Sequence, residues 1–381
     1  MDLSVLVAFF GVLVMGIMMS LPGSIKLKLA EVLNIDNARV GKLISTLMLS
    51  SLVAVLIIGP LTDMIGYRAI AITGFLLSGI CILVVAVARD YKKAVLAFLF
   101  LGIGGMCANT VGNVLGPLVL FGGEDPTRAS NLLNVFFCLG AFLTPLIVAG
   151  LMGKHGFRKT VGLMGAILFI PLIFSMFASY PPPEEGFVIT RSLALFGNAT
   201  VLIGGLSLFC YIALEASMAG FVTTYLKDYD LTDKQAETLL AGFWISLMVA
   251  RLIAVFTMGQ VGDQAVVVPL LAMLAIVSIG IMIASRTPVG GAAGTMLLGL
   301  SFGPIFPTVV GVTYIKTDAF SLGITGSVFG VIFAFGLLGG VIVPALIGKY
   351  TDHYSIRQSL KIAMIVAAVL VLVSSLLWLA V

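Results

Sequence analysis

The sequence predicts an all-α membrane protein whose twelve transmembrane helices form two pseudo-symmetric six-helix bundles. The first observation is composition: of 381 residues, 60% are hydrophobic and 10% are charged, which excludes a water-soluble globular domain. The second is a series of apolar runs, each of about 20 residues or more, separated by short polar breaks. The third is that short motifs recur at an offset near 200 residues, which indicates that a six-helix unit is duplicated.

The longest polar break, residues 180–193, follows the sixth apolar run and divides the chain nearly in half. It is typical of a linker between two bundles, here residues 1–179 and 194–381. The other loops are too short for a soluble domain, and no cleavable signal peptide is expected before the first span. The expected spans are residues 3–29, 40–61, 68–89, 93–121, 129–152, 159–179, 195–226, 235–259, 264–285, 288–315, 320–348 and 358–380.

Residues 59–68 form a very tight hairpin between the second and third spans. Asp63 and Arg68 are the only charged residues in it, and a carboxylate there can face the positive N-terminal end of another helix. Gly59 and Gly66 allow neighbouring backbones to approach closely. We therefore expect these four residues to form a conformational latch that holds helices together until the molecule changes shape.

Three further charged residues are candidates for the latch. Asp263 repeats Asp63 at an offset of 263 − 63 = 200 residues. Arg128 follows the loop after the fourth span and fits a latch or an anchor at the membrane interface. Arg251 lies eight residues before Gly259, about 12 Å from the membrane face at helical rise. It could reach Asp263 or extend to the lipid headgroups.

Glu215 is the acidic residue placed deep within an expected span. An ionised group at the centre of a bilayer costs roughly 2.5 to 3.5 kcal/mol on insertion scales, so a partner, water or a proton must compensate. One interpretation is that Glu215 lines a central cavity and binds a substrate hydroxyl, a cation or a proton. The other is a protonated acid that hydrogen-bonds a neighbouring helix. Tyr211, one helical turn earlier, is a binding candidate with it.

Amide and aromatic side chains complete the expected substrate site. Asn109 and Asn113 share one face of the fourth span, and Asn134 lies on the fifth. Amides donate and accept hydrogen bonds without adding charge, which suits a neutral polyol, although buried amides also hold membrane helices together. Trp244 and Phe306 could stack on the apolar face of a sugar ring.

The sequence contains no catalytic constellation, nucleotide-binding loop or metal cluster, so neither an enzyme nor a cofactor is expected. The net charge of +4 is spread over short loops and gives no reason to expect a nucleic-acid partner. The expected partners are the lipid bilayer, a small-molecule substrate and, for coupling, a proton or sodium ion. A chain with two bundles is expected to work as a monomer.

The hairpin resembles the signature of the major facilitator superfamily, G-x-L-x-D-x-x-G-x-[RK], in spacing and in its place between the second and third spans. Residues 109–117, 128–141, 209–215 and 299–308 resemble the fucose:proton symporter family and its sodium-glucose-transporter-like relatives. The resemblance implies a transporter of neutral sugars that works by alternating access, with its substrate between the two halves. It also implies a bacterial inner membrane, with both termini and the linker in the cytoplasm.

One departure from that family bears on ion coupling. In the proton-driven fucose branch an acid in helix 4 is implicated in coupling, and Gly105 stands at the matching position here. Some relatives have a glutamate where this chain has Glu215, so Glu215 inherits the candidacy for coupling or hydroxyl binding. An uncoupled facilitator is the alternative.

The leading hypothesis is therefore a secondary transporter of a small neutral solute, a sugar or polyol, with coupling through Glu215. A proton-driven exporter of an amphipathic compound is the alternative, which the 17 methionines and 25 phenylalanines would suit. A non-transporting membrane sensor is a third hypothesis, against which the lack of a signalling domain counts.

Loop charges oppose the orientation that the resemblance implies. With the termini in the cytoplasm, the cytoplasmic loops hold only Arg68, Arg128, Arg191 and Lys316, while sixteen lysine and arginine residues lie at the opposite loops. The positive-inside rule predicts the reverse. We follow the family resemblance, because it rests on residues at specific positions, and expect cytoplasmic termini.

Overall fold

A computed structural model describes residues 2–182, 189–351 and 353–379 of the chain. Over these ranges the secondary structure is helical, with no strand. The helices are α1 (Leu3–Leu33), α2 (Asn37–Ile65), α3 (Tyr67–Val87), α4 (Tyr91–Val119), α5 (Pro126–Ile167), α6 (Phe169–Phe177), α7 (Ile189–Ala194), α8 (Ala199–Lys227), α9 (Asp233–Thr257), α10 (Val267–Ala284), α11 (Pro288–Phe302), α12 (Ile305–Lys316), α13 (Thr325–Thr351) and α14 (Ile356–Leu379).

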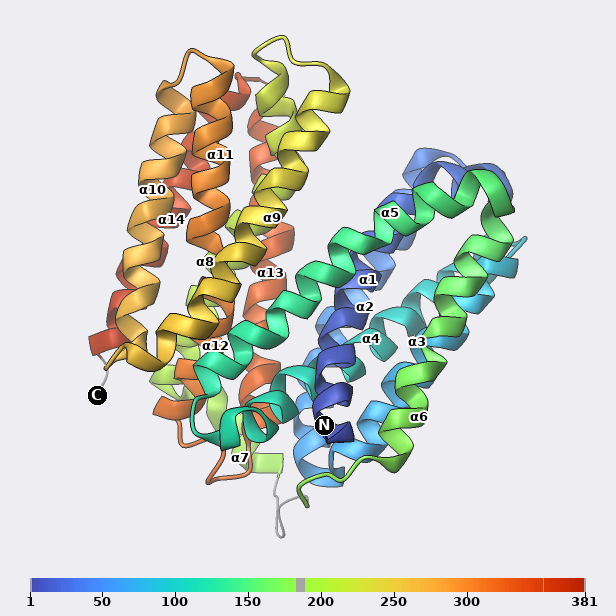
Figure 1. The fold of residues 1–381 in the computed structure, drawn as a ribbon, viewed down its shortest axis with the longest axis vertical. Helices are drawn as coiled ribbons and strands as arrows, with labels where there is room; N and C mark the ends of the chain where they lie inside the picture. The colour runs from blue at the N-terminus through green and yellow to red at the C-terminus, as the bar shows by residue number, and fades with distance from the viewer. Residues whose placement is uncertain (1, 183–188, 352, 380–381) are drawn as a thin grey trace. The chain divides into compact units, whose positions relative to one another are not determined.

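Among the described residues, eleven helical segments are long and apolar enough to cross a membrane. One of them, Pro126–Phe177, has 52 residues and carries two of the expected spans. It turns back on itself at Gly156, whose φ of 72° is a backbone conformation that favours glycine. Figure 1 shows this turn between the long first part of α5 and α6. The prediction of an all-α protein with twelve spans in two bundles is therefore confirmed.

Contacts between Cα atoms divide the chain into two compact units. The first contains Met1–Glu124, Leu133–Leu193 and Phe320–Gly330. The second contains Asp125–Leu132, Ala194–Ala319 and Val331–Val381. The units differ from contiguous halves because each one takes up the first turns of a helix that continues in the other, namely α5 and α13. Part of the expected linker, residues 183–188, lies outside the described residues.

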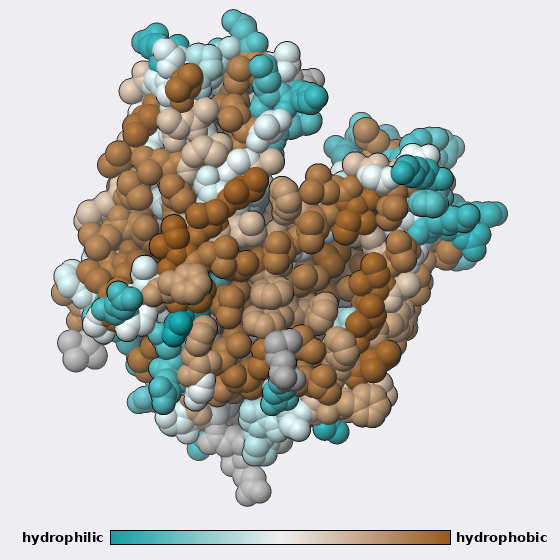
Figure 2. Space-filling view, in the orientation of Figure 1, coloured by the Kyte–Doolittle hydropathy of each residue, from teal (hydrophilic) through white to brown (hydrophobic). Residues whose placement is uncertain are grey.

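Each unit is built around a buried helix that is rich in small residues. In the first unit α4 packs against α1, α2 and α3, and Gly112 lies so close to α1 that an added Cβ would be 2.8 Å from the Ala8 carbonyl oxygen. In the second unit the buried span is formed by α11 and α12; α11 packs against α9 and α10, and α12 packs against α8. Hydrophobic residues cover the sides of the helices, and hydrophilic residues gather at their ends (Figure 2), as a bilayer-spanning protein requires.

Candidate functional site

The second unit holds a buried polar network formed by α8 and α9. The Tyr211 hydroxyl donates a hydrogen bond to Glu215 Oε1 at 2.7 Å, one helical turn along α8. Arg251 of α9 places its Nη2 3.8 Å from the same carboxylate oxygen and 3.4 Å from the Tyr211 hydroxyl. The Arg251 side chain is 2% exposed and that of Glu215 is 16% exposed, so the carboxylate is the charge that remains open to a ligand.

A break between α11 and α12 provides a further acceptor for Arg251. Pro307 has no backbone N–H, so it cannot donate to the carbonyl of Gly303 four residues earlier, as a helical residue normally would. Arg251 Nε donates to this carbonyl at 2.9 Å. The proline therefore leaves a carbonyl free, and the arginine satisfies it within the protein.

Aromatic rings surround the network. The Tyr211 ring centroid lies 5.9 Å from that of Phe302 and 6.2 Å from that of Phe306. Phe243 contacts Phe302, with centroids 6.2 Å apart, and Trp244 meets Phe243 edge-on at 5.3 Å. Phe306 is thus next to the network, whereas Trp244 reaches it through Phe243.

The position of Arg251 corrects one expectation from the sequence. An arginine near a span end was expected to extend to the lipid headgroups or to Asp263, but its 1% exposure shows that it is buried in the unit. Asp263 Oδ1 accepts instead from the backbone N–H of Ala265 at 3.0 Å, which caps the short turn that follows it. The ion pair with Glu215 could not be read from spacing, because it depends on the rotation of α8 against α9.

The first unit brings together the three predicted amides. Asn113 Nδ2 donates to the backbone oxygen and to Oδ1 of Asn109, each at 3.0 Å. Asn134 Nδ2 donates to Asn113 Oδ1 at 3.4 Å, which joins α4 to α5. Asn109 is 3% exposed, and its Nδ2 has no hydrogen-bond partner among the described residues. An unpaired buried donor is costly unless a ligand or water satisfies it.

Gly105, which the resemblance aligns with the coupling acid of the fucose branch, faces the flexible side chain of Met18. An added Cβ would lie 1.7 Å from Met18 Sδ and 2.2 Å from Met18 Cε. A side chain at this position of α4 would therefore require the Met18 side chain of α1 to move. The buried Asn131, one helical turn before Asn134 on α5, belongs to the second unit, where its Nδ2 is 3.4 Å from Thr308 Oγ1.

The carboxylate of Asp63 caps the first turn of α13 within the first unit. Its Oδ1 accepts from the N–H of Gly326 at 2.7 Å, and its Oδ2 accepts from the N–H and hydroxyl of Ser327 at 2.7 and 2.6 Å. Gly59 makes this possible, because any Cβ there would lie 2.3 Å from the Gly326 carbonyl oxygen. A buried carboxylate held by several donors at a helix N-terminus is a strong electrostatic cap.

The other residues of the expected latch make separate contacts. Gly66, with φ 84°, ends α2. Arg68 Nη2 donates to the Ala178 carbonyl at 3.0 Å, and its guanidinium lies 5.8 Å from the ring centroid of Tyr180. Burial raises the pKa of the Tyr180 phenol, and the charge of Arg68 lowers that pKa in part.

The second unit contains a related arrangement at the start of α5. Arg128 Nε donates to the Val255 carbonyl at 2.7 Å. Asp125 Oδ1 accepts from the N–H of Arg128 at 2.9 Å and from Gln264 Nε2 at 3.1 Å. Gln264, the residue after Asp263, therefore makes the hydrogen bond, and Asp125 rather than Asp263 supplies the carboxylate. The latch role of all these residues stays a prediction.

Sequence reasoning missed three residues of the buried network: Phe243, Phe302 and Gly303. A signal for Gly303 was present, because a proline four residues later frees its carbonyl. The two phenylalanines carry no signal that separates them from the other 23 of the 25 in the chain.

Comparison with known proteins decides the family. The family model of the Major Facilitator Superfamily matches residues 8–318, which is most of the chain. The chain belongs to the Major Facilitator Superfamily. Curated relatives include a putative glucose/galactose transporter of Helicobacter pylori, 26% identical over 80% of this chain and 78% of that protein. Another is a probable nitrate/nitrite transporter, NarK2, of Mycobacterium tuberculosis, 25% identical over 92% of this chain and 90% of that protein.

Solved structures of this superfamily share the fold. The major facilitator transporter FucP, in its outward conformation, aligns with a TM-score of 0.80 over 98% of this chain and 99% of that chain, at 16% identity. The human organic anion transporter MFSD10 aligns with a TM-score of 0.78, also at 16% identity. At these identities the likeness shows the fold, and the function must be argued from the site.

Proposed function

We propose that this membrane protein is a secondary transporter of a small neutral solute, a sugar or polyol, coupled to an ion through Glu215. The observation that carries the proposal is a partly exposed carboxylate held beside aromatic rings, with Tyr211 and Arg251 fixing its orientation. A carboxylate accepts hydrogen bonds from hydroxyl groups, and an aromatic ring stacks on the apolar face of a sugar. Glucose/galactose transporters among the relatives support this class of substrate.

The same carboxylate argues against an anionic substrate. One relative is named as a nitrate/nitrite transporter, and one structural neighbour as an organic anion transporter. In this chain the cation of the network, Arg251, is 1% exposed and is occupied by Glu215 and Gly303. A negative solute would then meet the more exposed Glu215 first, which repels it at low effective dielectric.

The three amides of the first unit extend the proposal. Asn109, Asn113 and Asn134 carry no charge, and Asn109 Nδ2 offers an unpaired donor. A neutral polyol presents hydroxyl oxygens that can accept from this donor.

For the rest of the molecule we propose a monomer in a bacterial inner membrane, with cytoplasmic termini and no cofactor.

Counterflow in proteoliposomes tests the substrate class. Vesicles containing the purified chain are preloaded with one unlabelled sugar or polyol of a panel, and uptake of the same labelled compound is followed. We expect transient accumulation for at least one neutral sugar and none for labelled nitrate. If nitrate or an organic anion exchanges, while no sugar in the panel does, the proposal is wrong.

A further inference from the structure

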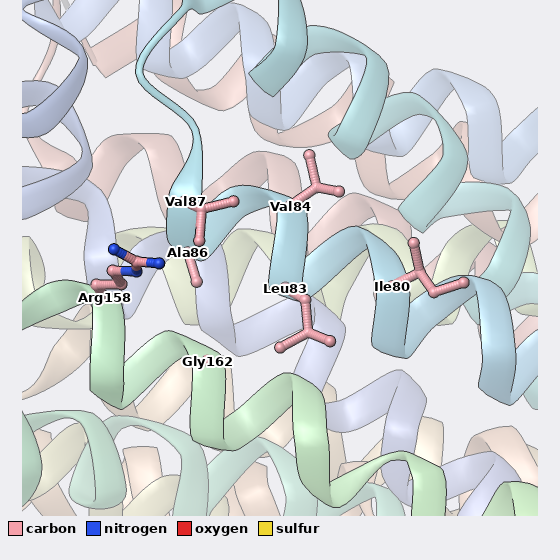
Figure 3. Close-up of a pocket in the computed structure, with 7 residues that line it drawn as sticks. All are labelled: Ile80, Leu83, Val84, Ala86, Val87, Arg158 and Gly162. Atoms are coloured by element: carbon pink, nitrogen blue, oxygen red, sulfur yellow. The ribbon is translucent and has the colours of Figure 1, made fainter.

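An apolar groove with one charged side chain lies between α3 and α5 of the first unit (Figure 3). Its volume is about 390 Å³, and α3 lines it with Ile80, Leu83 and Val87 among other aliphatic residues. Ile80 is 42% exposed and Val87 is 52% exposed, so the groove opens on the outer surface of the unit. Ile80, Leu83 and Val87 all belong to α3, which is long and apolar enough to span the membrane (Tyr67–Val87). We therefore expect the groove to face lipid.

Arg158 is the charged residue of this groove. Figure 3 shows its guanidinium extending from α5 toward Ala86 and Val87, at the end of α3. No hydrogen bond or ion pair holds the Arg158 side chain among the residues that the structure describes. A guanidinium presents five N–H donors in a planar fork, which matches the oxygen atoms of a phosphate.

The surrounding charges favour an anion at this end of the unit. The loops and helix ends at residues 26–42, 89–93 and 154–159 carry four, three and three lysine or arginine residues. Only three carboxylates oppose them, Glu31, Asp36 and Asp90. The helix that carries Arg158 also restarts after the break at Gly156, so its positive end adds to the field.

We propose that this groove binds an anionic phospholipid, with the phosphate on Arg158 and an acyl chain along Ile80, Leu83 and Val87. The apolar wall recognises the chain, and the guanidinium recognises the phosphate. A zwitterionic lipid has the same phosphate, but its ammonium group would meet the surrounding lysine and arginine residues. The site therefore distinguishes lipids by headgroup charge. It is independent of the proposed substrate.

Native mass spectrometry of the purified full-length chain tests the headgroup part. The protein is titrated separately with dioleoyl phosphatidylglycerol and dioleoyl phosphatidylcholine, and the fraction carrying one lipid is measured. We expect the wild type to prefer phosphatidylglycerol, and Arg158→Gln to weaken that lipid about tenfold, because a charge-assisted hydrogen bond is lost. Lys159→Gln is the matched control: it removes the same charge one residue away, outside the groove, and should leave the preference in place.

Gly162→Leu tests the acyl-chain part of the site. An added Cβ at Gly162 meets only Ala86 Cβ, at 3.9 Å, so the helix contact tolerates a side chain that then fills the groove. Gly150→Leu, where an added Cβ meets nothing within 4 Å, is its control. We expect loss of bound phosphatidylglycerol for Gly162→Leu alone. Equal retention by the wild type, Arg158→Gln and Gly162→Leu, or equal affinity of the wild type for both lipids, would overturn the proposal.

Discussion

Arg251 and Glu215 form an ion pair, with 3.8 Å between their charged atoms, and each is expected to lose stability without the other. Arg251 is fully enclosed, and it also donates to the Gly303 carbonyl and to the Tyr211 hydroxyl. Glu215 has the Tyr211 hydroxyl and a partial opening. Removing the arginine therefore leaves the Gly303 carbonyl without this donor and the carboxylate without its nearby cation, and removing the carboxylate leaves a buried cation without its nearby anion.

Arg251→Met should destabilise the protein strongly, by roughly 3 kcal/mol, because a carboxylate in the span loses its cation. The double variant Glu215→Gln with Arg251→Met should recover part of that loss, since no unpaired charge remains. Thermal unfolding in detergent measures both, and Arg286→Met, at an exposed loop arginine, is the control. Additive losses in the double variant would show that the two side chains do not form a working pair.

Asp63 is the second residue whose neighbours define a prediction. Asp63→Asn keeps one acceptor oxygen but loses the charge that faces the N–H groups of Gly326 and Ser327. We expect hydrogen exchange of those two amides to accelerate about fivefold, in line with the loss of a helix cap worth about 1 kcal/mol. Asp36→Asn, which removes the same charge from the cap of α2 at Arg39, should leave them unchanged. Unchanged exchange in Asp63→Asn would contradict the assigned cap.

At the scale of elements, small residues set how closely helices approach. Gly59 of α2 faces Gly326 of α13, and an added Cβ would overlap the Gly326 carbonyl oxygen at 2.3 Å. Backbone atoms cannot move aside as the end of a flexible side chain can, so a methyl group must separate the two helices.

Gly59→Ala should therefore lower stability by about 1 to 3 kcal/mol, as overpacking does. It should also weaken the Asp63 cap, because the amides of Gly326 and Ser327 move away. Gly150→Ala, with no atom within 4 Å of the added Cβ, is the matched control. Equal thermal unfolding of the two variants would mean that α2 and α13 are not in close contact.

The positions of the helices could be predicted from the sequence, but the side-chain contacts between helices could be predicted only in part. Apolar runs and charged breaks located the spans, because the bilayer leaves backbone polar groups no other arrangement. The place of Asn109, Asn113 and Asn134 in one cluster followed from spacing on α4 and the neighbouring span. The pairing of Arg251 with Glu215 did not follow from spacing. These residues are 36 positions apart (251 − 215), and their contact depends on how α8 and α9 are rotated about their axes.

At the scale of the molecule, the duplicated sequence gives related but unequal structures. An added Cβ at Gly59 would meet Gly326 in the first turn of α13, whereas one at Gly259 would lie 3.6 Å from Asp125 Oδ2, just before α5, and different carboxylates serve the two sites. Asp63 caps α13 directly, whereas Asp125 of the α5 start binds Gln264, the neighbour of Asp263. The sequence repeat pointed to Asp263 as the counterpart of Asp63, whereas Gln264 and Asp125 make the contact. Spacing alone could not distinguish between neighbouring polar side chains.

Orientation is the prediction that concerns the whole chain. We propose cytoplasmic termini, although sixteen lysine and arginine residues then lie at the outer loops and only four at the inner ones. We expect Ser355→Cys to react with a membrane-impermeant maleimide in intact cells, and Gly262→Cys to react only after permeabilisation. Both positions are exposed, and the four native cysteines are buried. The reverse labelling pattern would show that loop charge sets the orientation.

The central claim is that Glu215 binds the solute or its coupling ion, and one comparison tests it most directly. Proteoliposomes with wild type, Glu215→Gln or the exposed control Glu237→Gln are given a sugar that exchanges, with and without proton and sodium gradients. We predict that Glu215→Gln loses gradient-driven accumulation and keeps exchange if it couples an ion, or loses both if it binds the sugar. Exchange and accumulation equal to those of Glu237→Gln would contradict the claim.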